Sequence, residues 1–182
     1  MKFIPAALAG VLVIEPRVFR DERGLFFEQY RRDEFQANGV TADFVQDNYS
    51  VSAKGVLRGL HYQVAPRAQS KLVSVLRGSA FDVVVDVRPA SQTFGKAFTT
   101  VLSAADRKML FIPEGFAHGF LSLEDDTEFI YKCSDVYSPE HERGIRWDDP
   151  ALGIPWPKIG IEYILSPKDR MHPLLKDLHG PR

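Results

Sequence analysis

Short runs rich in β-branched and aromatic residues recur through most of this chain, and turn sequences such as Pro113-Glu114-Gly115 separate them. In one run Phe81, Val83 and Val85 alternate with other residues, so their side chains share one face of a strand. No helical period of comparable length interrupts the series. This spacing predicts an antiparallel β sandwich or barrel, with strands over 11–14, 71–77, 80–87, 98–102, 109–112, 116–123 and 127–133.

Local signals add a hairpin and two short helical segments to this prediction. Only Gly78-Ser79 separates the runs 71–77 and 80–87, which favours a β-hairpin. A short helix is expected over 33–37, with Asp33 as its N-cap and Asn38-Gly39 as its end. One helical turn is expected over 103–107.

The chain has 182 residues, a length typical of a single domain. No linker or repeat divides it, so we expect one domain over 1–182 with its core over about residues 10–175. The proline-rich segment from Pro150 is expected to wrap around the barrel. The end of the chain, 177–182, is expected to fray.

Charge and cysteine content narrow the classes of function. The 23 basic and 24 acidic side chains nearly cancel, which argues against bulk binding of nucleic acid or of an anionic membrane. The apolar stretch over 6–14 is shorter than the ~20 residues that span a bilayer, and it runs into Glu15-Pro16-Arg17 without a signal-peptide cleavage site. Because Cys133 is the single cysteine, no internal disulfide can form, and we expect a cytoplasmic protein.

Few residues suggest chemistry by themselves. The five histidines show no zinc-binding spacing, and Gln63 stands where a second ligand on the strand of His61 would be, so we expect a site without metal. His61 has Arg58 and Lys71 nearby in sequence, which fits either a base in a cationic pocket or a surface position. Tyr131 fits a core tyrosine with its hydroxyl at the rim. Glycine-loop motifs for phosphate are absent from the sequence, so arginine and lysine would have to hold any phosphate.

Several dispersed motifs occur in the order found in one known family. The chain resembles the dTDP-4-dehydrorhamnose 3,5-epimerases, which are β jelly rolls of the cupin superfamily. The similarity covers about residues 12–175 and is carried by FRDERGLFFE (19–28), FVQDNYS (44–50), VLRGLHYQ (56–63), KLV (71–73), IPEGFAHGF (112–120), YKCSDVYSPEHERGIRW (131–147) and SPKD (166–169).

The resemblance implies an all-β, cupin-type jelly-roll or double-stranded β-helix barrel with a few short helices, and an isomerase without cofactor or metal. Such an enzyme converts dTDP-4-dehydro-6-deoxy-α-D-glucose to dTDP-4-dehydro-β-L-rhamnose in dTDP-L-rhamnose biosynthesis. By the same resemblance, His61 is the base and Asp169 its partner, Lys71 stabilises the enolate oxygen and Tyr131 is the acid. A histidine with an ordinary pKa of ~6.5 and a tyrosine of ~10 suit these roles at neutral pH.

The resemblance also implies a substrate-binding set and a homodimer whose subunits complete each other's sites, with Phe19 and Arg23 acting on the partner. Tyr49 stands where relatives carry histidine, and its hydroxyl still permits hydrogen bonding. Alternative functions are a C3-only or C5-only epimerase, a keto-isomerase, and a non-catalytic ligand-binding cupin. The binding set is Phe19, Arg23, Glu28, Gln46, Asn48, Arg58, Lys71, His118, Glu142 and Lys168.

Overall fold

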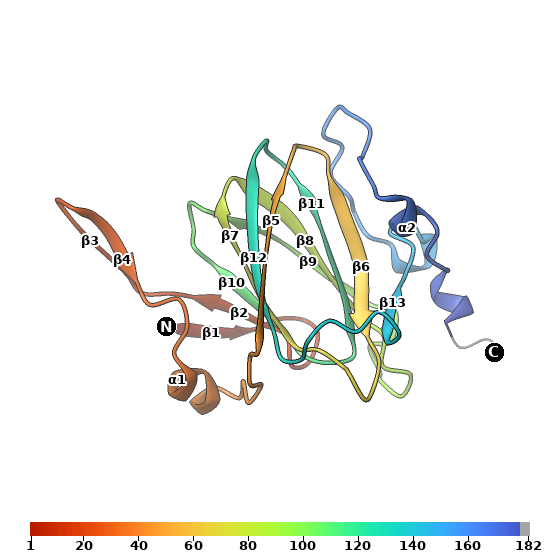
Figure 1. Cartoon of the computed structure of the whole chain (residues 1–182), viewed down its shortest axis with the longest axis horizontal. Helices are drawn as coiled ribbons and strands as arrows, with labels where there is room; N and C mark the ends of the chain where they lie inside the picture. Colours follow the sequence, from red (N-terminus) through yellow and green to blue (C-terminus); the bar gives the residue numbers. More distant parts are fainter. Residues whose placement is uncertain (179–182) are drawn as a thin grey trace.

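Two antiparallel sheets face each other in the computed structural model, which describes residues 1–178 (Figure 1). The first sheet has six strands and contains four of the strands expected from the sequence, those over 11–14, 71–77, 109–112 and 127–133. In spatial order they are β1 (Lys2–Pro5), β2 (Leu12–Glu15), β10 (Met109–Ile112), β7 (Lys71–Arg77), β12 (Thr127–Cys133) and β5 (Gln46–Ser52).

The second sheet has five strands and faces the first across the core. Its spatial order is β13 (Glu142–Gly144), β6 (Leu57–Gln63), β11 (Phe116–Ser122), β8 (Ser79–Asp86) and β9 (Ala97–Ser103). Two further strands, β3 (Val18–Asp21) and β4 (Gly24–Phe27), form a separate hairpin that extends away from the body of the molecule (Figure 1).

The space between the sheets is apolar along part of its length. Val73 and Phe129 from the first sheet pack against Val84, Phe116 and Phe120 from the second. The rings of Phe120 and Phe129 stack with their centroids 4.1 Å apart. Beyond this layer, polar side chains line the interior where β7 and β5 begin and β12 ends. The core therefore closes one part of the sandwich and leaves a polar cavity in the other.

The C-terminal segment covers the outer face of the five-stranded sheet. Trp147, Trp156 and Tyr163 pack over a cluster that includes Leu57 and Leu60. This is the wrapping arrangement expected for the segment after Pro150. The segment also contains the 3₁₀ helix η1 (Pro150–Leu152), the short helix α2 (Pro167–Arg170) and the 3₁₀ helix η2 (Leu175–Asp177). Of the tail expected to fray, Asp177 ends η2, Leu178 follows it, and 179–182 lie outside the described residues.

The outer face of the six-stranded sheet is covered by the segment around α1 (Arg32–Ala37). Phe35 from this helix is fully buried and packs against a cluster containing Leu72 and Met109. The helix begins one residue before the expected one. Its N-cap is Arg31, whose side chain makes no capping bond to the backbone of the helix, so the expected capping by Asp33 is wrong. The Asp33 carboxylate instead accepts a bond from the Arg31 guanidinium.

Two other local expectations are wrong. The runs 71–77 and 80–87 do not form a hairpin, because β7 lies in the six-stranded sheet and β8 in the five-stranded one. At Gly78 the chain crosses between the sheets with a φ of +73°, and a Cβ there would lie 2.7 Å from Thr127 Oγ1. The segment 103–107 is a turn at the end of β9 rather than a helix.

Candidate active site

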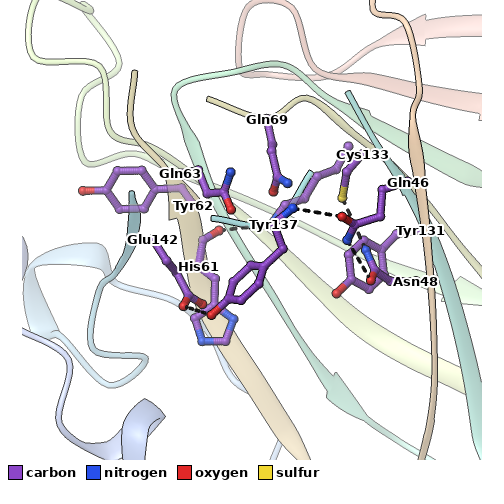
Figure 2. A pocket seen from close by; sticks show the side chains of 11 residues that line it. Gln46, Asn48, His61, Tyr62, Gln63, Gln69, Tyr131, Cys133, Tyr137 and Glu142 are labelled. Carbon is purple, nitrogen blue, oxygen red and sulfur yellow. Dashed lines mark hydrogen bonds between the residues drawn. The ribbon is translucent and has the colours of Figure 1, made fainter. Parts of the chain in front are cut away.

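Two adjoining cavities open between the sheets, with volumes of about 330 and 380 Å³. Four residues line both: Asn48, His61, Lys71 and Tyr131. His61 comes from β6 in one sheet, and the other three come from the opposite sheet. Figure 2 shows His61 and Tyr131 on different sides of the first cavity. The sequence-predicted base and acid therefore lie on opposing walls.

A bulge in β6 turns His61 into the interior. His61 pairs with His118 and Arg58 pairs with Phe120, so two residues of β6 oppose the single Gly119 of β11. As a result Arg58 and His61 line the second cavity although they are three residues apart. A Cβ on Gly119 would lie only 2.6 Å from the carbonyl oxygen of Arg58, so the close approach of these strands requires glycine there.

The carboxylate of Asp169 holds His61 from outside the sandwich. Helix α2 begins after Ser166, whose hydroxyl caps the backbone N–H of Asp169. Burial alone would raise the pKa of Asp169, but the nearby His172 and His61 imidazoles hold that pKa well below its usual range. The carboxylate therefore accepts, and His61 Nε2 donates to Asp169 Oδ1 at 2.6 Å. This tautomer leaves Nδ1 of His61 as the nitrogen with an available lone pair.

Tyr131 faces the interior from β12, on the same side as Phe129 and Cys133, as the alternation predicts. Burial raises the pKa of its phenol, which keeps the group protonated at neutral pH. Cys133 is buried, and its sulfur accepts a hydrogen bond from Asn48.

Lys71 places a buried cation between these groups. Its side chain is nearly inaccessible, and Nζ donates to the carbonyl oxygen of His61 at 3.3 Å. Burial lowers the pKa of the ammonium, because removal from water disfavours the charged form. Nearby acidic groups, including Glu142 and Asp82, oppose that shift.

Other predicted binding residues gather around the two cavities. Gln46 and Asn48 lie side by side on β5, joined by an amide hydrogen bond of 3.0 Å. Glu142 on β13 accepts a bond from the hydroxyl of Tyr137 (Figure 2). It also accepts one from Lys168. Tyr49 lines the edge of the second cavity but is more than half exposed.

His118 lies deeper in the second cavity and is buried. Its Nε2 bonds Asp82 Oδ2 at 2.9 Å, while the other carboxylate oxygen of Asp82 is buried without a hydrogen-bond partner among the described residues. The pair supplies a fixed imidazole on the floor of the cavity.

Three predicted binding residues are not brought to these cavities. Phe19 is on β3 of the projecting hairpin, Arg23 is in its turn, and Glu28 follows β4. A shallow separate pocket lies on the hairpin itself and includes Phe19 and Arg23. Arg23 is paired there with Asp21.

Sequence reasoning missed two residues near the predicted base and acid, His61 and Tyr131. Tyr137 lines the first cavity, and its position in the YSPEHERG string carried no separate signal. His172 follows Asp169 by three residues, and its Nε2 lies 3.4 Å from Asp169 Oδ1. The i, i+3 spacing across a helix end was the available signal.

Comparison with known proteins assigns the family. The family model described as dTDP-4-dehydrorhamnose 3,5-epimerase matches residues 5–177. The chain belongs to this family. A dTDP-4-dehydrorhamnose 3,5-epimerase from Shigella flexneri is 52% identical over 170 residues, which are 93% of this chain and 93% of that protein.

Solved structures of related epimerases agree in fold. A dTDP-6-deoxy-D-glucose-3,5-epimerase from Legionella pneumophila Philadelphia 1, in complex with dTDP-4-keto-L-rhamnose, has a TM-score of 0.93 and 46% identity, covering 97% of this chain and 94% of that one. A 3'-monoepimerase from Streptomyces bikiniensis, in complex with dTDP-quinovose, has a TM-score of 0.88 and 39% identity, covering 94% and 87%.

Membership of the dTDP-4-dehydrorhamnose 3,5-epimerase family confirms the cupin-type all-β fold and the isomerase class that the sequence motifs implied. It also confirms that dTDP-linked sugars are the ligand class of such proteins. Among the described helices, none is long and apolar enough to cross a membrane.

Proposed function

We propose that this chain inverts C3 and C5 of dTDP-4-dehydro-6-deoxy-α-D-glucose to give dTDP-4-dehydro-β-L-rhamnose. The observation that carries the proposal is the placement of His61 and Tyr131 on opposing walls of one cavity. Inversion needs a base on one face of the carbon and a proton donor on the other. In the starting D-gluco ring the hydrogens on C3 and C5 project from the same face, so one base on one wall can serve both carbons.

In the proposed step, Nδ1 of His61 removes the proton next to the C4 ketone, and the C–H electron pair forms the enolate. Asp169 fixes the tautomer of His61 and stabilises the imidazolium. The buried ammonium of Lys71 stabilises the negative charge that develops on the C4 oxygen. Tyr131 then donates its phenolic proton to the same carbon from the opposite face. Between rounds, the imidazolium loses its proton to solvent and the phenolate regains one.

The remaining residues suit a nucleotide diphosphate. Arg58 and Lys168 line the second cavity and offer positive charge to phosphate oxygens. Gln46 and Asn48 offer amide hydrogen bonds in the first cavity. His118 and Glu142 complete the polar lining.

The hairpin residues enter the same proposal through a homodimer. Phe19 is 49% exposed and Phe26 69% exposed on a hairpin that stands away from the body (Figure 1). Such an exposed apolar projection favours burial against a second copy. There Phe19 offers an aromatic face for thymine, and Arg23 and Glu28 offer charge at the partner's cavity. The single reduced cysteine and the nucleotide-sugar substrate favour a cytoplasmic location.

A single-centre epimerase is the second candidate, favoured by the structural similarity to the Streptomyces bikiniensis monoepimerase. The test is incubation of chelator-treated protein with dTDP-4-dehydro-6-deoxy-D-glucose in D2O, with an L-rhamnose-forming reductase to trap product. We expect deuterium at C3 and C5 and trapped dTDP-L-rhamnose by NMR. Label at one carbon would instead assign a single-centre enzyme, and no label at all would refute catalysis.

A further inference from the structure

Asp169 Oδ1 faces two histidines at once. His61 Nε2 lies 2.6 Å from this oxygen and His172 Nε2 lies 3.4 Å from it. The two imidazole rings meet edge to face with their centroids 5.3 Å apart. His172 Nε2 is buried and makes no hydrogen bond to any residue of the described chain, so its 3.4 Å approach to Asp169 Oδ1 is an electrostatic contact.

The ring of His172 is held in place from the other side by β13. Gly144 pairs with His61 in the sheet, and a Cβ on Gly144 would lie 2.3 Å from His172 Cε1. The imidazole therefore packs directly on the Cα of residue 144, where the side chain of any residue other than glycine would clash with the ring. Its side chain is only 9% exposed. The position of His172 is thus fixed relative to His61 by the backbone of the adjacent strand.

At 3.4 Å from a carboxylate oxygen, a lone pair on His172 Nε2 would be repelled, whereas an N–H there is attracted. We propose that His172 is a positioning residue that shares Asp169 with His61 and thereby limits how strongly Asp169 stabilises the His61 imidazolium. This inference rests on the proposed function of His61 as the base. A base must release its proton after each transfer, and a carboxylate shared between two donors holds that proton less tightly.

Other charged groups lie around the cluster, but they stay constant when His172 alone is changed. A comparison of His172 variants therefore isolates the contribution of that side chain. These groups are Glu142 on β13, Lys71 on β7, Lys168 on α2 and Arg146, whose guanidinium pairs with Asp148 and whose N–H bonds Pro173.

The test compares His172→Phe, which keeps an aromatic ring but has no donor, with His172→Gln, which keeps an N–H donor of similar reach. In the first variant Asp169 serves His61 alone, so His61 holds its proton to higher pH. We expect its imidazole NMR titration midpoint, and the acidic limb of kcat/KM against pH, to move up by about 0.5 to 1 pH unit, the size of one modest hydrogen bond. His172→Gln should restore the wild-type midpoint.

The NMR titration is independent of turnover, so it separates this inference from the proposed function. A protein without epimerase activity whose His61 midpoint still moves in His172→Phe would refute the function and keep the shared carboxylate. An unchanged midpoint in folded His172→Phe, checked by thermal unfolding, would overturn the role of His172. Stoichiometric zinc in the purified wild-type protein, lost in His172→Phe, would also overturn it, since the three side chains would then be metal ligands.

Discussion

Replacement of Tyr131 by phenylalanine separates the two steps of an inversion, which are proton abstraction on one face of the carbon and reprotonation on the other. The change removes one oxygen from the cavity wall. The Tyr131 hydroxyl makes no hydrogen bond to another described residue, and the ring contact with Phe129 does not involve it, so the cost to folding should be below about 1 kcal/mol. Loss of the proton donor should lower the rate of inversion by about 10²- to 10⁴-fold, or roughly 3 to 5 kcal/mol in the barrier.

The assay follows both steps in D2O. Because His61 and Lys71 remain, Tyr131→Phe should still exchange substrate hydrogen for deuterium by abstraction and return on one face. Trapped L-rhamnose product should be lost. Tyr62→Phe is the matched control, because Tyr62 is next to His61 on β6 and touches the first cavity, but its ring packs with the outer cluster and its hydroxyl points away from the site (Figure 2). Normal inversion by Tyr131→Phe would refute the assignment of the acid, and loss of exchange as well would show that Tyr131 acts before reprotonation.

Three further predictions concern the base His61, the cation Lys71 that faces the enolate oxygen, and the stability of the fold in acid. His61→Ala should abolish turnover and deuterium exchange while dTDP binding by calorimetry is kept, and retained turnover would remove His61 from the mechanism. Burial lowers the pKa of Lys71, so activity should fall on the alkaline side below the ordinary lysine value of ~10.4, and Lys71→Arg should move that limb upward. Burial opposes the charge of Asp86, but bonds from Arg88 and neighbouring hydroxyls outweigh it and hold its pKa well below its usual range. Its carboxylate therefore stabilises the fold fully at pH values above ~3.9, the pKa of aspartate in the unfolded chain, and this contribution is lost as pH falls further. In urea unfolding, the free energy of unfolding of Asp86→Asn should fall less on acidification than that of the wild type.

Alternation in the sequence predicted the strands whose two faces have distinct environments. The runs 71–77, 109–112 and 127–133 coincide with β7, β10 and β12, and Tyr131 faces the interior as its period indicates. Local signals failed where tertiary contacts decide. The Gly78-Ser79 pair has hairpin composition, yet the chain crosses between sheets there because the core lies between β7 and β8.

The arrangement of the site could not be predicted from short stretches of the sequence, because it depends on contacts between distant segments. A β bulge brings Arg58 and His61 to one cavity, and a strict two-residue alternation would have separated them. Asp169 and His61 are 108 residues apart in the sequence, so the resemblance to the family was needed to pair them. His172 was missed because its meaning depends on the backbone of Gly144, which only the fold places beneath it.

A sandwich of two sheets is well suited to inversion at two carbons of one ring. Facing sheets lie ~10 Å apart, and the core fills that gap in one part of this molecule with stacked aromatic rings. In the polar part, the same gap separates the strand of His61 from the strand of Tyr131. A sugar ring bound there would present one face to each wall. Because the two reacting hydrogens share a face, a small shift of the ring along the wall would bring either carbon to the same base and acid. The proposed mechanism therefore needs one catalytic pair rather than two.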